Sequence, residues 1–226
     1  MKKVSDQSDN LAQSWISNAD VWTAAVRDGG IESRRLVTDQ AIVNAVLAQQ
    51  PQRVLDLGCG EGWLVRALSE HGVEGVGVDG SPNLIEAAQS AGGGSFHVCT
   101  YSEVADGSSH IGNGFDVVAA NFALLHDDAG ALLRALRQSL VPRGKVVIQT
   151  VHPCSVGGAY RDGWREEDFR NFKGTWQPMP WYFRTLGSWM TLLQECGYTI
   201  INLVEPLHPN TQLPMSLLVI AESKTR

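Results

Sequence analysis

The chain has 226 residues, which is enough for one full α/β domain and too few for two domains of ordinary size. Apolar residues account for 43% of it and charged residues for 19%, so the composition predicts a packed core and excludes a wholly disordered chain. Its 24 acidic residues outnumber its 18 basic ones, and the resulting net charge of −6 argues against broad binding of nucleic-acid phosphates.

Two further classes of protein are disfavoured. No apolar run reaches the roughly 18 residues that a membrane-spanning helix needs. The first residues lead into a polar stretch and not into the apolar core of a signal peptide, so we expect a cytoplasmic protein. Cys59, Cys99, Cys154 and Cys196 are widely separated, so no Cys-x-x-Cys pair predicts a metal site and the thiols should be free.

The pattern of apolar residues predicts helices and strands in alternation. Two helical segments, about 10–27 and 38–49, come before the first strand. Strands are expected at 53–57, 75–79, 95–99, 115–120 and 145–151, with helices between them at 63–71, 82–88 and 132–140. Near-continuous Val, Leu and Ile runs separated by helices are typical of a parallel sheet that is covered on both faces.

The pattern changes after residue 151. Residues 152–183 hold glycines, prolines and tryptophans with little periodicity, and an insertion of this length is usually a lid or a binding loop. A helix at 186–196 and strands at 198–204 and 217–221 follow. We therefore expect a single domain over 1–226, with 1–50 as an N-terminal helical cover and 152–183 as a lid or substrate-binding insertion.

The most informative stretch covers residues 54–63 (Val-Leu-Asp-Leu-Gly-Cys-Gly-Glu-Gly-Trp), where an apolar strand leads into three glycines and then a helix. Such glycines permit a tight turn and let a ligand approach the backbone. The dinucleotide fingerprint G-x-G-x-x-G would need glycine in place of Trp63. Asp56, two residues before the first glycine, would repel a pyrophosphate and attract an ammonium or a sulfonium. The turn therefore favours a cationic ligand without a phosphate.

A second carboxylate, Asp79, ends the run Gly75-Val-Gly-Val-Asp79. In a doubly wound sheet it would lie beside the glycine turn, in the crevice at the carboxyl ends of adjacent strands. There it can accept hydrogen bonds from both hydroxyls of a ribose. The alternative is that Asp79 only begins the loop before Ser81 and Pro82, which are typical of a helix N-terminus.

Together these stretches resemble the class I S-adenosylmethionine-dependent methyltransferases. The resemblance rests on residues 54–62, 75–81, 115–118 and 140–147; it covers 38–150 well and 184–222 more loosely. It implies a Rossmann-like α/β fold with a doubly wound, mostly parallel sheet of seven strands whose last strand is antiparallel. It also implies S-adenosylmethionine as cofactor and S-adenosylhomocysteine as product.

The resemblance assigns the cofactor to the glycine turn and the strands that follow it. Gly58, Gly60 and Gly62 would line its methionine part, and Asp79 would hold its ribose. A structural turn without a ligand is the alternative for the glycines, and Cys59 is expected to be a packed side chain and not a nucleophile. The whole predicted cofactor-binding set is Asp56, Gly58, Cys59, Gly60, Gly62, Asp79, Gly80, Thr100, Tyr101, Asn121 and Phe122.

Two pairs of residues later in the chain complete this set. Thr100 and Tyr101 follow the third strand, where the family borders the adenine, and Asn121 and Phe122 end the fourth, where it closes on cofactor and substrate. Many relatives have Asp near position 100, so with Thr100 the recognition of adenine would rest on backbone groups. Tyr101 either stacks on adenine or packs against the neighbouring helix.

Two histidines are candidate bases. His126 lies in the loop after the fourth strand and His152 follows the fifth, and either could take a proton from a substrate hydroxyl or amine. The alternative for each is a hydrogen-bonded structural histidine. If the acceptor carries no proton near neutral pH, no base is required.

The aromatic insertion is the candidate for binding the methyl acceptor. Tyr160, Trp181, Tyr182 and Arg184 are the predicted substrate contacts, because aromatic side chains with few charges favour a small organic molecule. The alternative for the aromatic residues is a satellite core, and Arg184 could pair either with a substrate carboxylate or with the glutamates at 166–167.

The predicted activity is methyl transfer from S-adenosylmethionine to an oxygen, nitrogen or carbon of a small organic acceptor by in-line displacement. Arg34 and Arg35, between the N-terminal helices, are placed to reach the cofactor's carboxylate. Two alternatives come from other classes: an NAD(P)-dependent oxidoreductase and a non-catalytic module that binds S-adenosylmethionine. The sequence does not identify the acceptor or the oligomeric state, and its acidic balance disfavours RNA.

Overall fold

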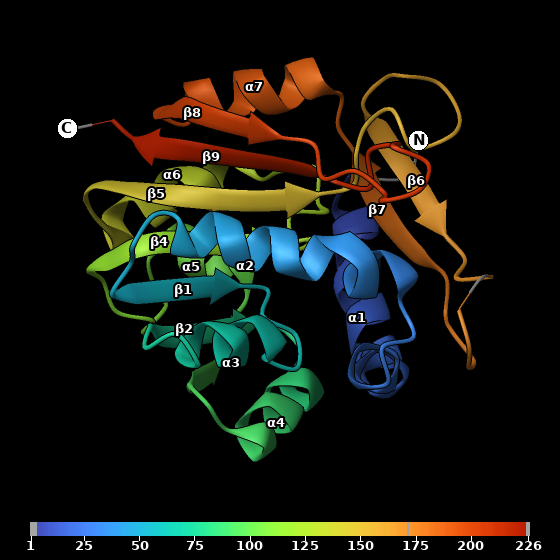
Figure 1. Ribbon diagram of the computed structural model, residues 1–226, viewed down its shortest axis with the longest axis horizontal. Coiled ribbons are helices and arrows are strands. Elements are labelled where there is room, and N and C mark those ends of the chain that lie inside the picture. Colours follow the sequence, from blue (N-terminus) through green and yellow to red (C-terminus); the bar gives the residue numbers. More distant parts are fainter. Residues whose placement is uncertain (1–3, 171, 225–226) are drawn as a thin grey trace.

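The computed structural model describes residues 4–170 and 172–224, and its centre is a seven-stranded sheet in the order β3-β2-β1-β4-β5-β9-β8 (Figure 1). Neighbouring strands from β3 to β5 are parallel, while β9 is antiparallel to both β5 and β8. The doubly wound sheet with an antiparallel last strand is therefore confirmed. The strands are β1 (Arg53–Leu57), β2 (Glu74–Asp79), β3 (Ser95–Val98), β4 (Phe115–Asn121), β5 (Leu140–Thr150), β8 (Tyr198–Val204) and β9 (Leu217–Ser223).

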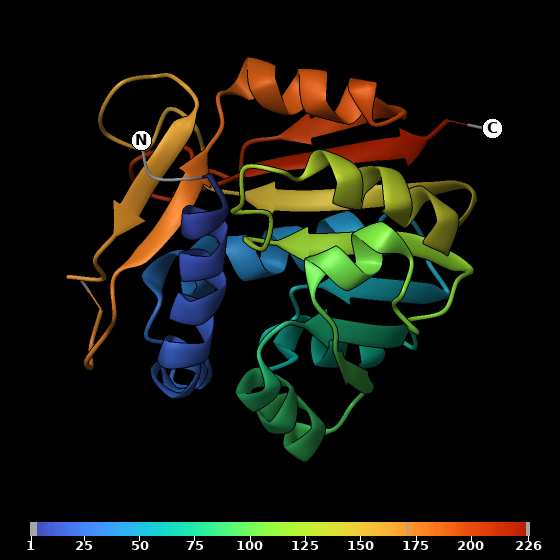
Figure 2. The same ribbon diagram turned by 180° about the vertical axis from the view of Figure 1, so that it is seen from behind.

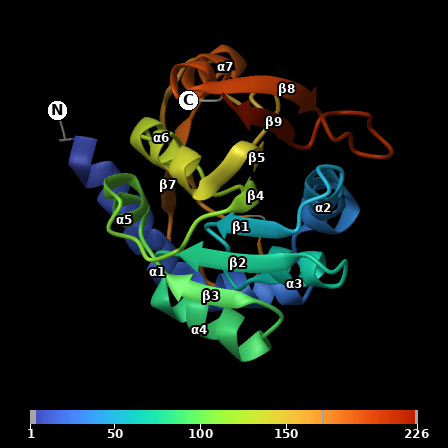
Figure 3. The ribbon, with the colours of Figure 1, turned by 90° about the vertical axis from the view of Figure 1, so that its left-hand side faces the viewer.

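Helices cover both faces of this sheet (Figure 3). Along β1 and β4, side chains point alternately to the two faces: Leu55 and Val118 enter one core, and Val54 and Val117 enter the other. Because the side chains on both faces are buried, the sequences of these strands are nearly continuous apolar runs. One face carries α2 (Asp39–Leu47), α3 (Trp63–Ser69) and α4 (Pro82–Ala91); the other carries α5 (Tyr101–Asp106), α6 (Gly130–Ser139) and α7 (Leu186–Glu195).

The start of α4 illustrates how local sequence sets an element. Pro82 occupies the first turn, where a missing backbone N–H costs nothing. Ser81 is the N-cap, and its hydroxyl accepts a hydrogen bond from the backbone N–H of Leu84. This arrangement begins the helix immediately after β2, and it leaves Asp79 at the exact junction between strand and helix.

A cover lies across the carboxyl ends of the strands (Figures 1 and 2). It consists of α1 (Val4–Arg27) and an antiparallel hairpin of β6 (Gly163–Glu167) and β7 (Met179–Phe183), and α1 packs against both β7 and α4. Side chains from the two parts, together with Leu125 of the loop after β4, share a small core: Leu11, Trp15, Leu125, Trp164, Phe169, Phe172, Trp176, Met179 and Trp181.

The structure differs from the sequence-based expectation at three places. The insertion contains the β6–β7 hairpin, whereas we expected little regular structure there. A short helix, α5, begins at Tyr101, and a π-helical turn, η1 (Arg34–Thr38), precedes α2; neither was predicted. Among the described residues no helix has the length and apolar character needed to cross a bilayer.

Candidate cofactor and acceptor site

The glycine turn between β1 and α3 is tied directly to β2. The backbone N–H groups of Gly58 and Cys59 both donate to the carbonyl oxygen of Val78, at 2.8 and 2.9 Å. The N–H of Gly60 donates to Asp79 Oδ2 at 3.0 Å. Gly58, Gly60 and Gly62 all have positive φ, at 71°, 55° and 85°, which favours glycine over any other residue. The turn is therefore a preformed structure that Asp79 helps to hold.

The three glycines face different surroundings. A methyl group at Gly58 would collide with the Ala123 side chain and the Tyr101 hydroxyl, both 2.6 Å away, so glycine is required for close approach. At Gly60 the nearest atom would be Trp22 Nε1 of α1, at 3.7 Å, which leaves room over the backbone. Gly62 instead faces the core around Phe96. Its role is close packing, and the predicted contact with the cofactor falls mainly to Gly58 and Gly60.

Two carboxylates stand side by side at the turn. Asp56 is only 2% exposed, and no hydrogen bond from the described residues reaches its carboxylate. Burial and then the charge of Asp79 raise the pKa of Asp56 to about 7, while Arg34 acts in the opposite sense. Burial also raises the pKa of Asp79, although backbone N–H donors from Ser81 and Gly60 oppose this. A cationic ligand would relieve this concentration of unpaired negative charge.

Arg34 supplies a positive group beside these carboxylates. It lies on the π-helical turn η1, an irregularity that is common at functional sites. Its guanidinium stacks over Trp63 at 4.5 Å, and its Nε donates to Asp39 Oδ1 at 2.8 Å. The structure gives the two Nη groups no partner among the described residues. The two Nη groups of Arg34 are therefore available to a carboxylate, whereas Arg35 is exposed.

These observations test whether S-adenosylmethionine fits. The sulfonium and ammonium of this cofactor match the charge of the unpartnered Asp56, and its carboxylate matches Arg34. The backbone of Gly60 is open to a ligand. Asp79 is a partial complication, because Oδ1 already accepts from Ser81 N–H at 2.8 Å and Oδ2 from Gly60 N–H. Each oxygen has a second lone pair, so bidentate contact with a ribose remains possible. The residues present fit this cofactor.

The first residue of the predicted adenine pair has a structural task. Thr100 is the N-cap of α5: its hydroxyl accepts from the N–H of Glu103, and the Glu103 carboxylate accepts from the N–H of Thr100. This capping box occupies the Thr100 side chain. Gly80 is exposed and close to Thr100, and the Cys59 thiol is buried against Phe96. At these three positions the backbone is the part available to a cofactor.

Tyr101 lies between the glycine turn and the loop after β4. Its hydroxyl donates to the carbonyl oxygen of Ala123 at 3.1 Å, and its ring is tilted at 5.1 Å from the ring of His126. Burial raises the pKa of Tyr101 well above its usual value, and the carboxylates of Asp79 and Asp56 add to this. It therefore stays a neutral hydrogen-bond donor that lines the site.

The end of β4 is held by a buried amide. Gln149 of β5 donates from Nε2 to Asn121 Oδ1 at 2.7 Å and to the Thr38 carbonyl at 2.8 Å, and its Oε1 accepts from Ser216 at 3.3 Å. The Gln149 carbonyl accepts from the N–H of Phe122, which has a positive φ of 52°. This strained residue turns the chain sharply where the predicted site closes.

The two candidate bases are in different states. His152 Nε2 lies 2.7 Å from Glu205 Oε1, and its Nδ1 accepts from the N–H of Cys154 at 3.2 Å, so both ring nitrogens are engaged. His126 Nδ1 is buried without a partner among the described residues. Burial and then the charge of Arg184 lower the pKa of His126 to about 4, which keeps it neutral. His126 is the better placed of the two.

The predicted acceptor contacts, like the two histidines, differ in their surroundings. Tyr160 is 54% exposed, and its hydroxyl accepts from the N–H of Leu186, while Trp181 packs in the satellite core described above. Tyr182 N–H donates to the Leu125 carbonyl at 2.7 Å, which joins the hairpin to the loop after β4. Arg184 forms no ion pair with the glutamates at 166–167, so that alternative was wrong.

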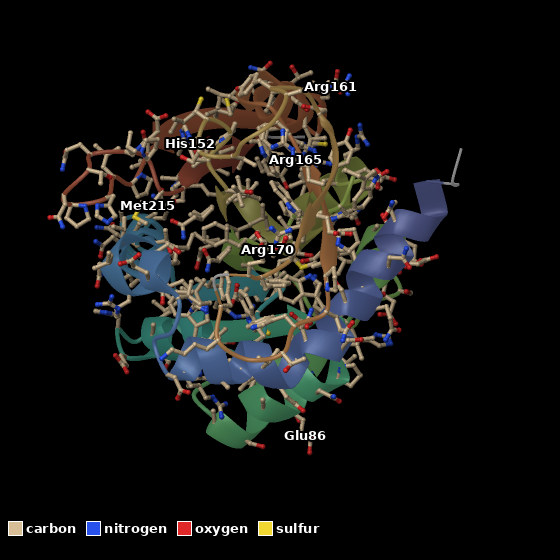
Figure 4. All side chains as sticks on the ribbon, turned by 90° about the vertical axis from the view of Figure 1, so that its right-hand side faces the viewer. Glu86, His152, Arg161, Arg165, Arg170 and Met215 are labelled. Carbon is tan, nitrogen blue, oxygen red and sulfur yellow. The ribbon has the colours of Figure 1, made fainter. Side chains whose placement is uncertain are left out.

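Figure 4 looks onto this end of the sheet. Arg165 and Arg170 of the insertion lie in front of the strands, whereas His152 and Met215 lie to one side. His152 therefore belongs to the contact between β5 and the loop before β9. His126 instead belongs to the centre of the site, because its ring contacts Tyr101 beside the glycine turn.

α1 contributes residues that sequence reasoning missed. Glu61 of the glycine turn is 1% exposed and lies between two arginines: Arg27 Nε of α1 at 2.9 Å and Arg66 Nη2 of α3 at 2.6 Å. Asn18 exchanges two hydrogen bonds with the backbone of Gln177, at 2.9 and 2.8 Å. These contacts tie α1 to the turn at one end and to the insertion at its middle. A pairing between residues so far apart left no signal in one sequence.

The fold and this site together define a class: a Rossmann-like S-adenosylmethionine-dependent methyltransferase. A sequence model described as a methyltransferase domain matches residues 33–212, most of the chain, and the chain belongs to that family. Its cofactor is accordingly S-adenosylmethionine, and the nicotinamide alternative is disfavoured.

Known proteins resemble the chain at several levels. It is 35% identical over 102 residues to a ubiquinone biosynthesis O-methyltransferase of Azorhizobium caulinodans, covering 44% of this chain and 40% of that protein. It is 31% identical over 163 residues to phosphoethanolamine N-methyltransferase 3 of Arabidopsis thaliana, covering 65% and 32%. The chain thus spans less than half the length of either relative.

Solved structures extend the likeness over nearly the whole chain. An S-adenosylmethionine-dependent methyltransferase from Mesorhizobium loti is 26% identical, with a TM-score of 0.61 over 79% of this chain and 96% of that one. The 1,6-didemethyltoxoflavin-N1-methyltransferase of Burkholderia thailandensis, solved with that compound and S-adenosylhomocysteine, is 21% identical, with a TM-score of 0.70 over 99% and 92%. At 21% identity this second likeness concerns the fold.

Proposed function

We propose that the protein transfers the methyl group of S-adenosylmethionine to a small organic acceptor. The observation that carries the proposal is the buried, unpartnered Asp56 carboxylate beside a glycine turn whose backbone is open at Gly60. The relatives support a small acceptor, because their names include an O-methyltransferase of ubiquinone biosynthesis and an N-methyltransferase of phosphoethanolamine.

The cofactor's two charged ends have matching partners in this arrangement. Asp56 would bind the cationic groups, Arg34 would bind the carboxylate, and Asp79 would bind the ribose. Tyr101 and the backbone of residues 80 and 100 border the adenine. Gly58, Gly60 and the backbone of Cys59 let the methionine part lie directly on the turn.

When bound, S-adenosylmethionine supplies a methyl group on a sulfonium, which is already an activated leaving group. The protein's work is therefore to position the acceptor in line and to exclude water. The cover formed by α1 and the β6–β7 hairpin is suited to this, because it lies across the strand ends (Figure 2) and its core is made of aromatic side chains. Asn121 and Phe122 form the floor on which the acceptor rests.

His126 is proposed to hydrogen-bond the acceptor and not to take its proton. A histidine whose pKa is about 4 is a weak base at neutral pH, so transfer to a group that needs strong deprotonation would be slow. Because both ring nitrogens of His152 are engaged, we assign it to the structure and not to the chemistry.

The test is a thermal-shift titration with S-adenosylhomocysteine, followed by a methyl-transfer screen over a metabolite library that detects S-adenosylhomocysteine release. We expect saturable stabilisation of the wild-type protein, and Asp79→Ala should lose most of it because the ribose contact and the brace on Gly60 both disappear. Stabilisation by NADH without any by S-adenosylhomocysteine would refute the proposal. Binding without transfer to any acceptor would favour the non-catalytic module.

Cytoplasmic location and the exclusion of nucleic acid as a substrate are part of this proposal. The acidic net charge of −6 supports the second of these.

A further inference from the structure

Arg184, which follows β7, is a buried arginine with an unusual set of partners. It is 5% exposed, and its guanidinium lies over the rings of Tyr182 and Trp189 at 4.9 and 5.1 Å. Its Nη2 donates to the backbone carbonyls of His126 and Asp127, at 2.7 and 2.6 Å. The side chain thus fastens the loop after β4 to the base of the hairpin.

What this arginine lacks is a counter-ion. Asp162, Asp127 and Asp128 are near enough to favour its charged form, but none of the ion pairs among the described residues includes Arg184. Its Nη1 is buried without any hydrogen-bond partner, and burial lowers its pKa. A fully buried cation is normally paired, because removing an unpaired charge from water is costly.

A second orphaned polar atom belongs to the neighbouring His126. Its Nδ1 is also buried without a partner, and Arg184 is the strongest charge acting on its ring. The two residues are joined by the hydrogen bond from Arg184 Nη2 to the His126 carbonyl, so both unsatisfied nitrogens belong to one buried junction, and buried polar atoms are normally paired. One permanent cation and one neutral imidazole favour a single negative charge with two acceptor oxygens.

This pair is connected to the cofactor side of the site by direct contacts. The His126 ring lies 5.1 Å from the Tyr101 ring, and the Tyr101 hydroxyl lies against Gly58 of the glycine turn. The order from the turn is therefore Gly58, Tyr101, His126 and Arg184. Negative charge at Asp56 and Asp79 lies at one end of this line, and positive charge at Arg184 lies at the other.

We propose that Arg184 and His126 form an anion-binding end of the acceptor pocket and that the methyl acceptor carries a carboxylate held there. The proposal rests on the proposed function, because it concerns the acceptor of that same site. A carboxylate suits the pair better than a phosphate dianion, since Arg184 supplies one positive charge and His126 is neutral. The carboxylate orients the acceptor so that another of its atoms faces the sulfonium.

The experiment compares probes that differ only in charge. 4-Hydroxybenzoate, 4-hydroxybenzamide and 4-hydroxyphenylphosphonate, with a matching set of aliphatic acids and amides, are titrated into the protein saturated with S-adenosylhomocysteine, and affinity is measured by calorimetry. We expect at least one carboxylate to bind about 10-fold or more tightly than its amide and its phosphonate. Equal affinities, a preference for the phosphonate, or no binding by any carboxylate would overturn the proposal.

Substitutions of Arg184 test whether this residue causes the preference for a carboxylate. Arg184→Met should abolish the preference for carboxylate over amide, and Arg184→Lys should keep part of it because it preserves the charge. Arg53→Met is the matched control: Arg53 also donates to a backbone carbonyl, that of Asn113, and lies over the ring of Phe115, but it begins β1, at the end of the strands opposite the site. Its loss should leave the preference intact, and loss of the preference in this control alone would refute the assignment.

The probes separate this inference from the proposed function. Binding of S-adenosylhomocysteine is measured first, and its absence would defeat the proposed function itself. If the cofactor product binds and the carboxylate preference is absent, only the present inference fails. Because the comparison of carboxylate with amide uses the wild-type protein, the test holds even if Arg184→Met does not fold.

Discussion

The two walls of the site are built on opposite physical principles. The wall at the glycine turn consists of backbone and carboxylates, with Asp56 and Asp79 held by strands that pair on both sides. The wall opposite, made of α1 and the β6–β7 hairpin, consists of aromatic rings that pack on one another, such as Phe169 stacked on Trp176 at 4.4 Å. One wall is rigid and charged, and the other is apolar and attached at a few polar contacts.

The difference teaches where each kind of specificity resides. A rigid, acidic wall can discriminate a cationic cofactor from a phosphorylated one at little entropic cost, because nothing has to be ordered on binding. An aromatic cover that rests on its own small core can change its lining without disturbing the sheet. Under the proposed function, cofactor recognition belongs to the turn, and acceptor recognition belongs to the cover and the loop that Arg184 fastens to it.

The most severe way to break the rigid wall is Gly58→Ala. The added methyl group would meet the Ala123 side chain and the Tyr101 hydroxyl at 2.6 Å, and alanine would be strained at a φ of 71°. We expect a loss of about 2–5 kcal/mol in the free energy of unfolding and no detectable binding of S-adenosylhomocysteine. Urea denaturation and calorimetry measure the two effects.

Gly72→Ala is the control for that change. Gly72 has a φ of 78°, nearly the same as Gly58, but a methyl group there meets nothing within 4 Å. It should cost only about 1–2 kcal/mol and leave cofactor binding unchanged. If the two variants behaved alike, crowding at the turn would not explain the requirement for glycine at position 58.

Asp56→Asn tests the acidic wall, because it should stabilise the protein without cofactor and weaken its binding of S-adenosylmethionine. The folded-state pKa of Asp56 is raised from 3.8 to about 7, so the associated stability is fully present below pH 4 and is lost as the pH rises through 7. Removing the charge should raise the free energy of unfolding by on the order of 2–4 kcal/mol at pH 8 and by little at pH 4. Urea denaturation at the two pH values tests this.

The same titration should appear in binding. A cationic cofactor favours the ionised carboxylate, so the affinity of the wild-type protein for S-adenosylmethionine should rise with pH through 7, and Asp56→Asn should flatten the profile. S-adenosylhomocysteine, which lacks the sulfonium charge, should show a weaker dependence. An identical pH dependence for the two compounds in wild type and variant would contradict the role given to Asp56.

The smallest expected effect comes from loosening the cover. Arg27→Met removes the contact of α1 with Glu61 but leaves Arg66 to neutralise that carboxylate. Because Arg27 is partly exposed, we expect the affinity for S-adenosylhomocysteine to fall only about 3- to 10-fold, with the free energy of unfolding reduced by ~1 kcal/mol. Hydrogen exchange should become faster in α1.

Arg143→Met is the matched control for Arg27→Met. It also breaks an ion pair of an exposed arginine, with Glu222, but at the ends of β5 and β9 that lie opposite the site. Neither cofactor affinity nor exchange in α1 should change. A comparable loss of affinity in this control would mean that net charge, and not the attachment of α1, controls binding.

The sheet could be predicted from the sequence because its signals are local. Leu55 and Leu57 lie in a continuous apolar run, and Pro82 after Ser81 marks the start of a helix. The confirmed fold, a doubly wound sheet whose last strand is antiparallel, follows from such runs once the family resemblance supplies the topology. The carboxylate at position 56 was recognisable because its distance from the glycines is short and fixed by the strand.

The cover could not be predicted because its contacts join residues that are distant in the chain. Glu61 meets Arg27, and Asn18 meets Gln177, without any local pattern that announces either pairing. α5 was a different kind of omission: Thr100 and Glu103 form a capping-box pattern that is visible in the sequence and that we did not use. Arg184 was among the predicted acceptor contacts, but its lack of a counter-ion is a property of the folded chain alone.

The buried amide of Gln149 has a consequence for how such a protein can diverge. A single replacement there would leave three groups without their hydrogen-bond partner: a carbonyl of the π-helical turn, the amide of Asn121 and the hydroxyl of Ser216. Variation at position 149 is therefore expected only in concert with its neighbours, whereas the aromatic insertion is free to drift one side chain at a time. Libraries meant to retarget the enzyme should spare this junction and randomise the hairpin.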